Sequence, residues 1–155
     1  MISIPFPVPF TLQIFGVYFA LFYLGARRGT VAILLYVAIG ALGLPVFSGF
    51  SGGFGRLFDA TGGFILGFII LALVYLALDS LTPPDGSRRA VSTVVSLVAF
   101  YIFGSAWYAA FYTDGSLGGY LASTALTVLP FVLPDLVKIA LAALLASRIK
   151  KALQK

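Results

Sequence analysis

Residues 62–78 read GGFILGFIILALVYLAL, an apolar run that carries no charged side chain. A helix that crosses a bilayer needs roughly 20 such residues, with a range of about 17–25. The rest of the chain has the same character, because 61% of the 155 residues are hydrophobic and 10% are charged. A soluble domain carries about 25% charged residues. We therefore expect an all-α integral membrane protein, with residues 1–155 forming a single membrane domain.

Four further apolar segments, together with residues 62–78, predict a bundle of about five transmembrane helices. The expected spans are residues 11–26, 30–44, 62–78, 90–112 and 135–151. The second span is short, so we expect tilt, local thinning of the bilayer or partial burial. Residues 116–129 precede Pro130 and Pro134, and proline disfavours helix at and before its own position. This segment is expected to be a short interfacial or re-entrant helix, with the last span starting afresh near Pro134.

The basic residues fall in three clusters at the ends of the expected spans. The clusters are Arg27 and Arg28; Arg88 and Arg89; and Arg148, Lys150, Lys151 and Lys155. Five spans put all three clusters on one side of the membrane, whereas an even number would divide them. The positive-inside rule then places the C-terminus in the cytoplasm and the N-terminus outside. The net charge of +5 has the same origin, so we expect the lipid bilayer and no nucleic acid as a partner.

The composition limits the chemistry that the chain can perform, because it has no Cys, His or Glu. This excludes disulfides, thiol chemistry, the usual zinc sites and histidine general bases. Catalysis by carboxylates alone needs two facing groups, and Asp135 is the one Asp expected at membrane depth. We therefore expect no enzyme, no metal and no cofactor.

A glycine-rich segment, SGFSGGFG at residues 48–55, separates the second and third spans on the outer side. Irregular backbone at membrane depth is tolerated where it is buried in protein or lines a cavity. The segment could form a lid or wall over an outward-facing pocket, or it could be an ordinary flexible loop. Its candidate binding residues, with the neighbours on either side, are Phe47, Ser48, Phe50, Ser51 and Arg56.

Asp135 and Lys138 are three residues apart at the outer end of the last span, so they share one helix face. We expect Asp135 in the first turn, where the helix dipole favours a carboxylate. Ionisable residues inside a membrane segment are costly and point to a functional site. The alternative is a local ion pair that caps the helix. Gln13, in the first span, could bind a ligand or join helices as structural glue.

Several stretches together resemble the BioY family, the biotin-specific S components of energy-coupling factor transporters. The resemblance covers nearly the whole chain, and its motifs are specific in their order and spacing. The matching stretches are PFTLQ at 9–13, GARRG at 25–29, LYVAIGALGLPVF at 35–47, TGGFILGF at 61–68 and LPFVLPDLVK at 129–138. Ala60 stands where the family usually has proline.

The resemblance implies capture of biotin from outside, in the plasma membrane of a prokaryote. It also implies a membrane-embedded coupling subunit and two cytoplasmic ATPases as partners. The family's D-x-x-K pair lines the biotin pocket and corresponds to Asp135 and Lys138. Asp135 would accept from the ureido group of biotin, and either Lys138 or Arg56 would bind its carboxylate. Gln13 and Tyr36, which lie in matching stretches, complete the candidate binding residues.

The family has six spans, with one more helix before its P-x-T-L-Q motif, so the resemblance implies an S-component-like fold minus one helix. A misassigned start, a truncation, or a natural short form that pairs differently or with itself would explain the difference. Two other functions stay open at this point. One is an S-like subunit for another small vitamin, and the other is a structural membrane protein in which Asp135 and Lys138 pair only with each other.

Overall fold

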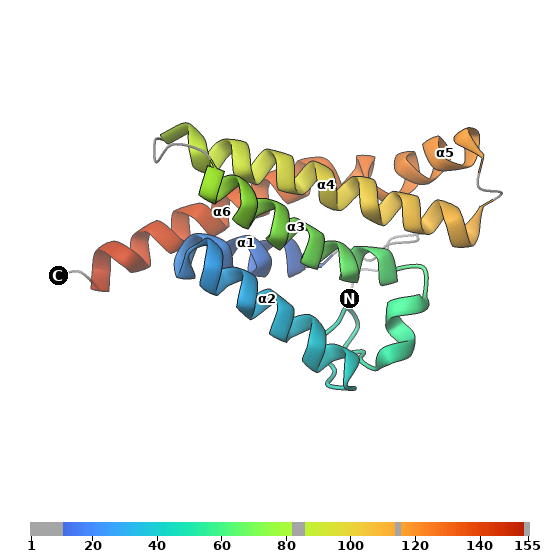
Figure 1. Ribbon diagram of the computed structural model, residues 1–155, viewed down its shortest axis with the longest axis horizontal. Coiled ribbons are helices and arrows are strands. Elements are labelled where there is room, and N and C mark those ends of the chain that lie inside the picture. The colour runs from blue at the N-terminus through green and yellow to red at the C-terminus, as the bar shows by residue number, and fades with distance from the viewer. Residues whose placement is uncertain (1–10, 82–85, 114–115, 154–155) are drawn as a thin grey trace.

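The computed structural model describes residues 11–81, 86–113 and 116–153 (Figure 1). Pro9, Phe10 and Lys155 lie outside these ranges. Within the described residues the chain forms six α-helices and one short 3-10 helix, with an isolated β-bridge between Phe47 and Ser51. The helices are α1 (Gln13–Leu24), α2 (Ala26–Ala41), η1 (Phe54–Phe58), α3 (Gly62–Leu81), α4 (Gly86–Tyr112), α5 (Leu117–Thr127) and α6 (Leu129–Leu153).

A helix occupies each of the five expected spans, which confirms the predicted all-helical bundle. By length and composition α3, α4 and α6 can each cross a membrane. The helices α1 and α2 have 12 and 16 residues, which is about 18 and 24 Å at 1.5 Å per residue. Full crossing of the bilayer by these two helices therefore stays a prediction.

The connection between α1 and α2 differs from the expected one. We expected the first span to stop at Arg27 to Gly29, but the chain turns at Gly25, which has a φ of 84°. This left-handed conformation suits glycine because it has no Cβ. Arg27 and Arg28 instead lie exposed in the first turn of α2. Gly29 permits the tight hairpin, because a Cβ there would lie 2.8 Å from the Cα of Leu21.

The corner before the last helix also differs from the prediction. The short helix expected over residues 116–129 is present as α5, but α6 begins at Leu129 and not near Pro134. Pro130 is tolerated because N–H groups in the first turn have no intrahelical acceptor. Pro134 removes one helical hydrogen bond, and α6 continues through it while packing against α1. Tertiary packing thus outweighs the local preference.

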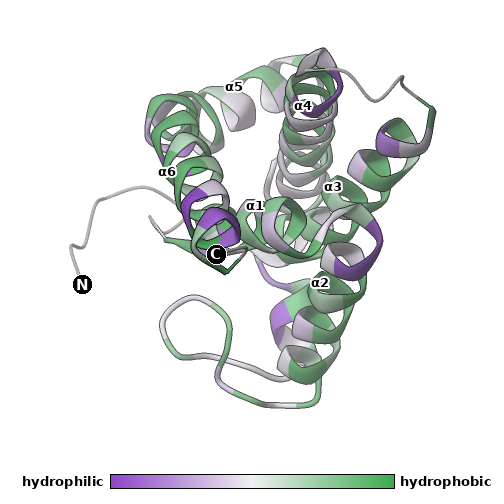
Figure 2. Ribbon diagram, turned by 90° about the vertical axis from the view of Figure 1, so that its left-hand side faces the viewer, coloured by the Kyte–Doolittle hydropathy of each residue, from purple (hydrophilic) through white to green (hydrophobic). Residues whose placement is uncertain are grey.

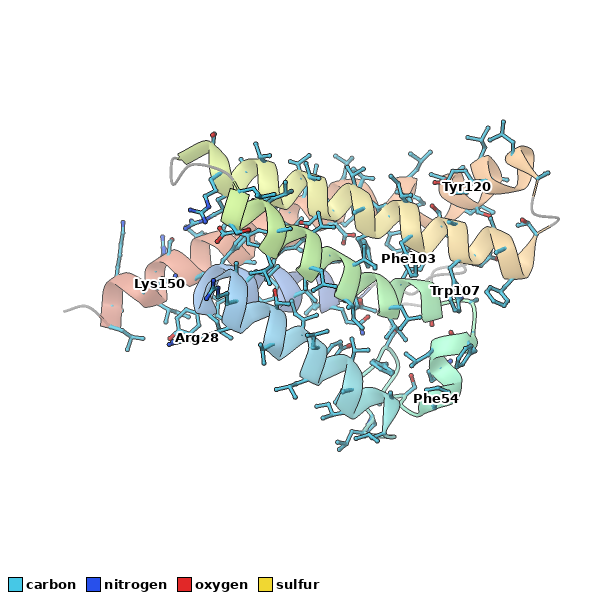
Figure 3. The ribbon with its side chains drawn as sticks, in the orientation of Figure 1. Arg28, Phe54, Phe103, Trp107, Tyr120 and Lys150 are labelled. Atoms are coloured by element: carbon cyan, nitrogen blue, oxygen red, sulfur yellow. The ribbon has the colours of Figure 1, made fainter. Side chains whose placement is uncertain are left out.

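The molecule has two distinct ends. The basic end contains the α1–α2 turn, the C-terminus of α3, the N-terminus of α4 and the C-terminus of α6 (Figure 1). Arg28 and Lys150 both lie there (Figure 3), and hydrophilic residues gather on the face that Figure 2 turns to the viewer. The loop end contains residues 42–61 and α5. The basic clusters therefore share one end, as predicted from five spans.

The core of the bundle lies around α1, which is central in Figure 2. Tyr18, Leu71 and Ala142, from α1, α3 and α6, are each 0% exposed. Large apolar side chains point outward on α4 and α6, where they suit contact with lipid. They include Val94, Val98, Ile102, Leu133, Leu136, Val137, Leu141 and Leu144. The chain is thus apolar on both its inner and outer surfaces, as a membrane bundle must be.

Glycines bring α3 and α4 into close contact. A Cβ at Gly63 would overlap the Cβ of Trp107, and a Cβ at Gly104 would overlap the ring of Phe64. Phe64 in turn packs edge-on against Phe100, with ring centroids 5.6 Å apart. Small residues at a helix interface permit this approach in membranes, and here they bring two aromatic side chains together next to the site described below.

We expect Gly63→Ala to destabilise the bundle by about 1–3 kcal/mol, because overpacking forces the two helices apart. Gly16→Ala is the matched control, since its Cβ meets nothing within 4 Å. Alanine is favoured over glycine inside a helix, so this control is expected to keep or raise stability. Thermal unfolding of both variants in the same detergent measures the difference. Equal midpoints would contradict the close contact of α3 with α4.

Candidate functional site

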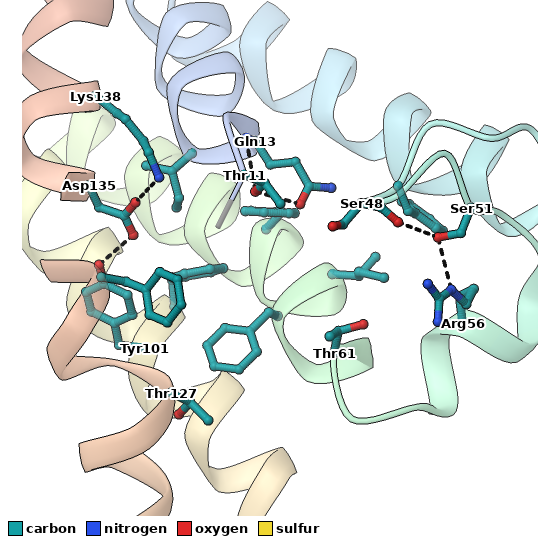
Figure 4. Close-up of a pocket in the computed structure, with 17 residues that line it drawn as sticks. Thr11, Gln13, Ser48, Ser51, Arg56, Thr61, Tyr101, Thr127, Asp135 and Lys138 are labelled. Atoms are coloured by element: carbon teal, nitrogen blue, oxygen red, sulfur yellow. Dashed lines mark hydrogen bonds and ion pairs between the residues drawn. The ribbon is translucent and has the colours of Figure 1, made fainter. Parts of the chain in front are cut away.

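A cavity of about 190 Å³ lies at the loop end, among α1, α3, α4, α6 and residues 47–61 (Figure 4). A cavity needs only about 10–15 Å³ to hold one water, so this one has room for a small organic molecule. Its polar lining comprises Thr11, Gln13, Ser48, Ser51, Arg56, Thr61, Tyr101, Thr127, Asp135 and Lys138. Its apolar lining comprises Ile14, Phe47, Phe64, Ile65, Phe68, Phe100 and Phe131.

Asp135 and Lys138 form a buried ion pair on one side of the cavity. The Nζ of Lys138 lies 2.8 Å from Oδ1 of Asp135, and the two residues are 6% and 4% exposed. The hydroxyl of Tyr101, on α4, donates to Oδ2 of the same carboxylate at 2.8 Å. Burying two charges costs several kcal/mol per ion before pairing repays it. A local ion pair that only caps the helix does not account for this arrangement. Tyr101 also donates to the carboxylate, and both members of the pair line the cavity.

The expected place of Asp135 in the first helical turn is wrong. Because α6 begins at Leu129, its first turn holds no acidic residue, and Asp135 lies further along the helix. The helix dipole acts mainly within the first turn, so it contributes little to this carboxylate. Hydrogen bonds from Lys138 and Tyr101 stabilise its charge instead.

Residues from the glycine-rich segment form the opposite side of the cavity through a chain of hydrogen bonds. Ser51 donates from its hydroxyl to the carbonyl of Ser48 at 2.7 Å, and Arg56 Nε donates to Ser51 Oγ at 3.0 Å. The guanidinium also pairs with Asp59 at 2.6 Å. Asp59 Oδ1 accepts from the backbone and hydroxyl of Thr61, at 2.8 and 2.7 Å. These hydrogen bonds and the lining of the cavity favour a wall over an ordinary flexible loop, the two alternatives for this segment.

Gln13 joins α1 to α2 and also lines the cavity. Its side-chain amide donates to the hydroxyl of Tyr36, which donates to the carbonyl of Val46 at 3.1 Å. Tyr36 packs edge-on against Phe47, with ring centroids 5.8 Å apart. Tyr36 therefore stands behind the lining and positions Gln13 and Phe47, whose side chains reach the cavity.

Phe50, like Tyr36, is an expected site residue that does not line the cavity. It is 90% exposed and has a φ of 55°. It occupies the tip of the turn that the Phe47–Ser51 bridge closes, so its ring points away while Phe47 and Ser51 face inward. The alternation of inward and outward residues in this turn could not be read from its composition.

Tyr101 was not among the expected site residues. Nor were Phe64, Phe68, Phe100 and Phe131, the cavity-lining rings that together form an aromatic wall. Phe68 and Phe100 stack with centroids 5.1 Å apart and an interplanar angle of 14°. Many aromatic side chains in a membrane protein face lipid, so nothing in the local sequence singled these out. Buried polar groups are nearly always hydrogen-bonded. A buried Asp135 was therefore expected to have a second donor, and this was the one available signal for Tyr101.

The two charged sides face each other across this aromatic wall. Figure 4 places Asp135 and Lys138 on one side and Arg56 on the other. Among the described residues that line the cavity, Asp135 is the one carboxylate, and no group of three His, Cys, Asp or Glu side chains gathers where the structure describes the chain. The arrangement suits binding of a small molecule with polar ends and an apolar middle. Fold and cavity together define a helical membrane protein with an internal cavity large enough for a small molecule.

The chain belongs to the BioY family, because the model of that family matches residues 1–155. It is 39% identical over 144 residues to a probable biotin transporter BioY of Pyrococcus horikoshii, covering 93% of this chain and 82% of that protein. It is also 39% identical over 151 residues to a biotin transporter BioY of Thermotoga maritima, covering 97% of this chain and 86% of that protein.

The fold of this chain also matches that of a solved structure. The crystal structure at 2.1 Å of the S-component for biotin from an ECF-type ABC transporter matches with a TM-score of 0.76 and 24% identity. The match covers 94% of this chain and 77% of that one. The suspected family and the S-component fold are thus confirmed. The relatives are named as transporters, which confirms the expectation that the chain is not an enzyme.

Proposed function

We propose that this chain is the substrate-binding membrane subunit of a vitamin uptake transporter and that it captures biotin at its loop end. One observation carries the proposal. The buried Asp135–Lys138 ion pair and Arg56 lie on opposite sides of one cavity, with aromatic side chains between them. Biotin is proposed as the ligand because the relatives in the BioY family are named as biotin transporters. The roles of individual residues are inferred from their contacts.

The ureido ring of biotin suits the Asp135–Lys138 pair, because it has N–H donors and a carbonyl acceptor side by side. Each carboxylate oxygen has two lone pairs and an ammonium has three donors. Asp135 can therefore accept from a ureido N–H while it keeps Lys138 and Tyr101. Ligand hydrogen bonds to such charged groups are stronger than neutral ones. The fused rings of biotin would then lie against Phe68 and Phe100.

The carboxylate of biotin is assigned to Arg56 rather than to Lys138. The side chain of Lys138 is 7% exposed and that of Arg56 is 44% exposed, although each is paired with one aspartate. A carboxylate at Arg56 stays partly hydrated, so its desolvation costs less than at Lys138. Guanidinium has five N–H donors, and the bonds to Ser51 and Asp59 use two of them.

Binding of labelled biotin to the purified full chain tests the proposal. Competition with lipoate, which has a carboxylate but no ureido group, and with a panel of other vitamins tests the specificity. We expect biotin alone to bind and to raise the thermal unfolding midpoint. Stabilisation by another vitamin in place of biotin would favour an S-like subunit of different specificity, and no binding at all would favour a structural protein.

We expect Arg56→Gln to weaken biotin binding about tenfold and to leave binding of biotinamide, the neutral amide, within about twofold. One lost charge-assisted hydrogen bond is worth about 1.5–3 kcal/mol, and tenfold is about 1.4 kcal/mol. Lys138→Gln is the comparison, and it should weaken both ligands because it acts on the ureido end. Isothermal titration calorimetry measures the affinity of each variant and of the wild type for both ligands. The reverse pattern would move the carboxylate to Lys138.

The basic end is proposed to face the cytoplasm of a prokaryotic cell, with the N-terminus and the loop end outside. The gathering of basic residues from all three clusters at one end supports this orientation under the positive-inside rule. In this arrangement the cavity opens toward the external supply of biotin. The basic end would then meet a membrane coupling subunit and cytoplasmic ATPases, or a second copy of the chain.

A further inference from the structure

A second cavity, of about 440 Å³, lies at the basic end, and none of the described residues lines both cavities. It is formed by the C-terminal turn of α1, the N-terminus of α2, the end of α3, the start of α4 and the last turns of α6. Its lining comprises Leu21, Phe22, Gly25, Ala26, Tyr75, Asp79, Arg88, Arg89 and Lys150. Nothing in the capture of biotin uses this cavity.

The cavity has an apolar floor and a cationic rim. Leu21, Phe22 and Tyr75 are 1%, 5% and 3% exposed, so they form a firmly packed base. Arg89 holds its guanidinium carbon 5.8 Å above the ring of Phe22, which fixes one cation beside the apolar surface. Lys150 approaches from α6 and is exposed. A ligand that enters meets both apolar and positive groups.

Among the described residues, the charges that line the cavity do not cancel. These are three cationic side chains and one carboxylate, and Arg88 pairs with that carboxylate, Asp79, at 2.9 Å. The N-terminus of α2 adds positive potential, because Gly25 at its N-cap has no side chain to accept from the first backbone N–H groups. Gly25 and Ala26 both line the cavity. Helix N-termini with nearby cations bind phosphate groups.

We propose that this cavity binds the phosphate of an anionic phospholipid, such as phosphatidylglycerol. The basic end marks the membrane surface, where lipid phosphates are concentrated. A floor of Leu21, Phe22 and Tyr75 suits the glycerol and first acyl carbons of a lipid and offers nothing to a free phosphate ion. Arg89, Lys150 and the N-terminus of α2 contact the phosphate. The bound lipid joins α1, α2, α4 and α6 at the end opposite to the biotin cavity.

Native mass spectrometry of the purified full chain, titrated in detergent with phosphatidylglycerol, tests the proposal. The double variant Arg89→Gln/Lys150→Gln should bind this lipid at least tenfold more weakly than the wild type. The matched control Arg28→Gln/Lys151→Gln removes the same two residue types, both exposed at the same end and absent from the cavity lining. This control should stay within about threefold of the wild type. Size-exclusion chromatography verifies that both variants are folded.

Each other outcome overturns the proposal. Equal losses in the two double variants would mean that diffuse surface charge, and not the cavity, attracts the lipid. Equal affinity for phosphatidylcholine would remove the role of charge. Binding of inorganic phosphate as tight as that of the lipid would make the cavity a site for soluble anions. Unchanged lipid binding by Arg89→Gln/Lys150→Gln would mean that the lipid binds elsewhere on the chain.

Discussion

Replacing Asp135 by asparagine is expected to weaken biotin binding at least tenfold while the helix bundle stays folded. Asparagine keeps the shape of the side chain and an acceptor for Tyr101, which donates to this position at 2.8 Å. It removes the negative charge that would strengthen hydrogen bonds from the ureido N–H groups. Truncating one member of a buried charged contact costs about 2–5 kcal/mol, and each 1.4 kcal/mol is about tenfold in affinity. Titration of labelled biotin into the variant measures the loss.

The matched control for this variant is Asp79→Asn at the basic end. Asp79 is also an aspartate in an ion pair, with Arg88 at 2.9 Å, but it lies outside the cavity proposed to bind biotin. Its variant should bind biotin within about twofold of the wild type. If Asp135→Asn kept wild-type affinity, the assignment of this carboxylate to the ureido group would be wrong. If both variants lost binding equally, the effect would lie in stability and not in recognition.

The helices themselves were predictable because the signals that define them are local. A run such as residues 62–78 is apolar over a length that spans a bilayer, and this needs no knowledge of the rest of the fold. The charge clusters added global information, since an odd number of spans puts Arg28, Arg88 and Lys150 at one end. That end is where the structure places them.

The helix boundaries were less predictable because they depend on single residues in their tertiary context. Gly25 and Gly29 look alike in the sequence, but Gly25 takes a left-handed φ and Gly29 lies inside a helix. Pro130 and Pro134 both weaken helix, and yet packing against α1 carries α6 through them. Local propensity is a weak prior that such packing routinely overrides.

The residues that line the first cavity were predictable where a local pattern marks them. The i, i+3 spacing of Asp135 and Lys138 put both on one face of a helix, and Arg56 stood out as a charge in a glycine-rich segment. Tyr101 could not be found in this way, because it reaches Asp135 from a different helix. Phe50 was assigned to the site by composition, and the geometry of its turn directs it outward.

Replacing Lys138 by methionine is expected to lower both biotin binding and stability, because it leaves the Asp135 carboxylate buried without its counter-ion. Breaking a buried ion pair in this way costs about 3–5 kcal/mol. The pair is 2.8 Å apart and Asp135 is 4% exposed, so the carboxylate loses its ammonium partner while it has little contact with bulk water. Thermal unfolding in detergent and titration of labelled biotin measure the two effects separately.

The double variant Asp135→Asn/Lys138→Met separates the two roles of the pair. Replacing both members of a buried pair by neutral groups of similar volume is often neutral or stabilising by about 1–4 kcal/mol, so the double variant should recover the unfolding midpoint that Lys138→Met alone loses. Asparagine still accepts from Tyr101 in this background. Biotin binding should stay at least tenfold weaker, because neither ureido contact is restored. If the double variant recovers stability but not binding, the pair serves ligand binding. If the double variant stays unstable, the pair serves the stability of the fold.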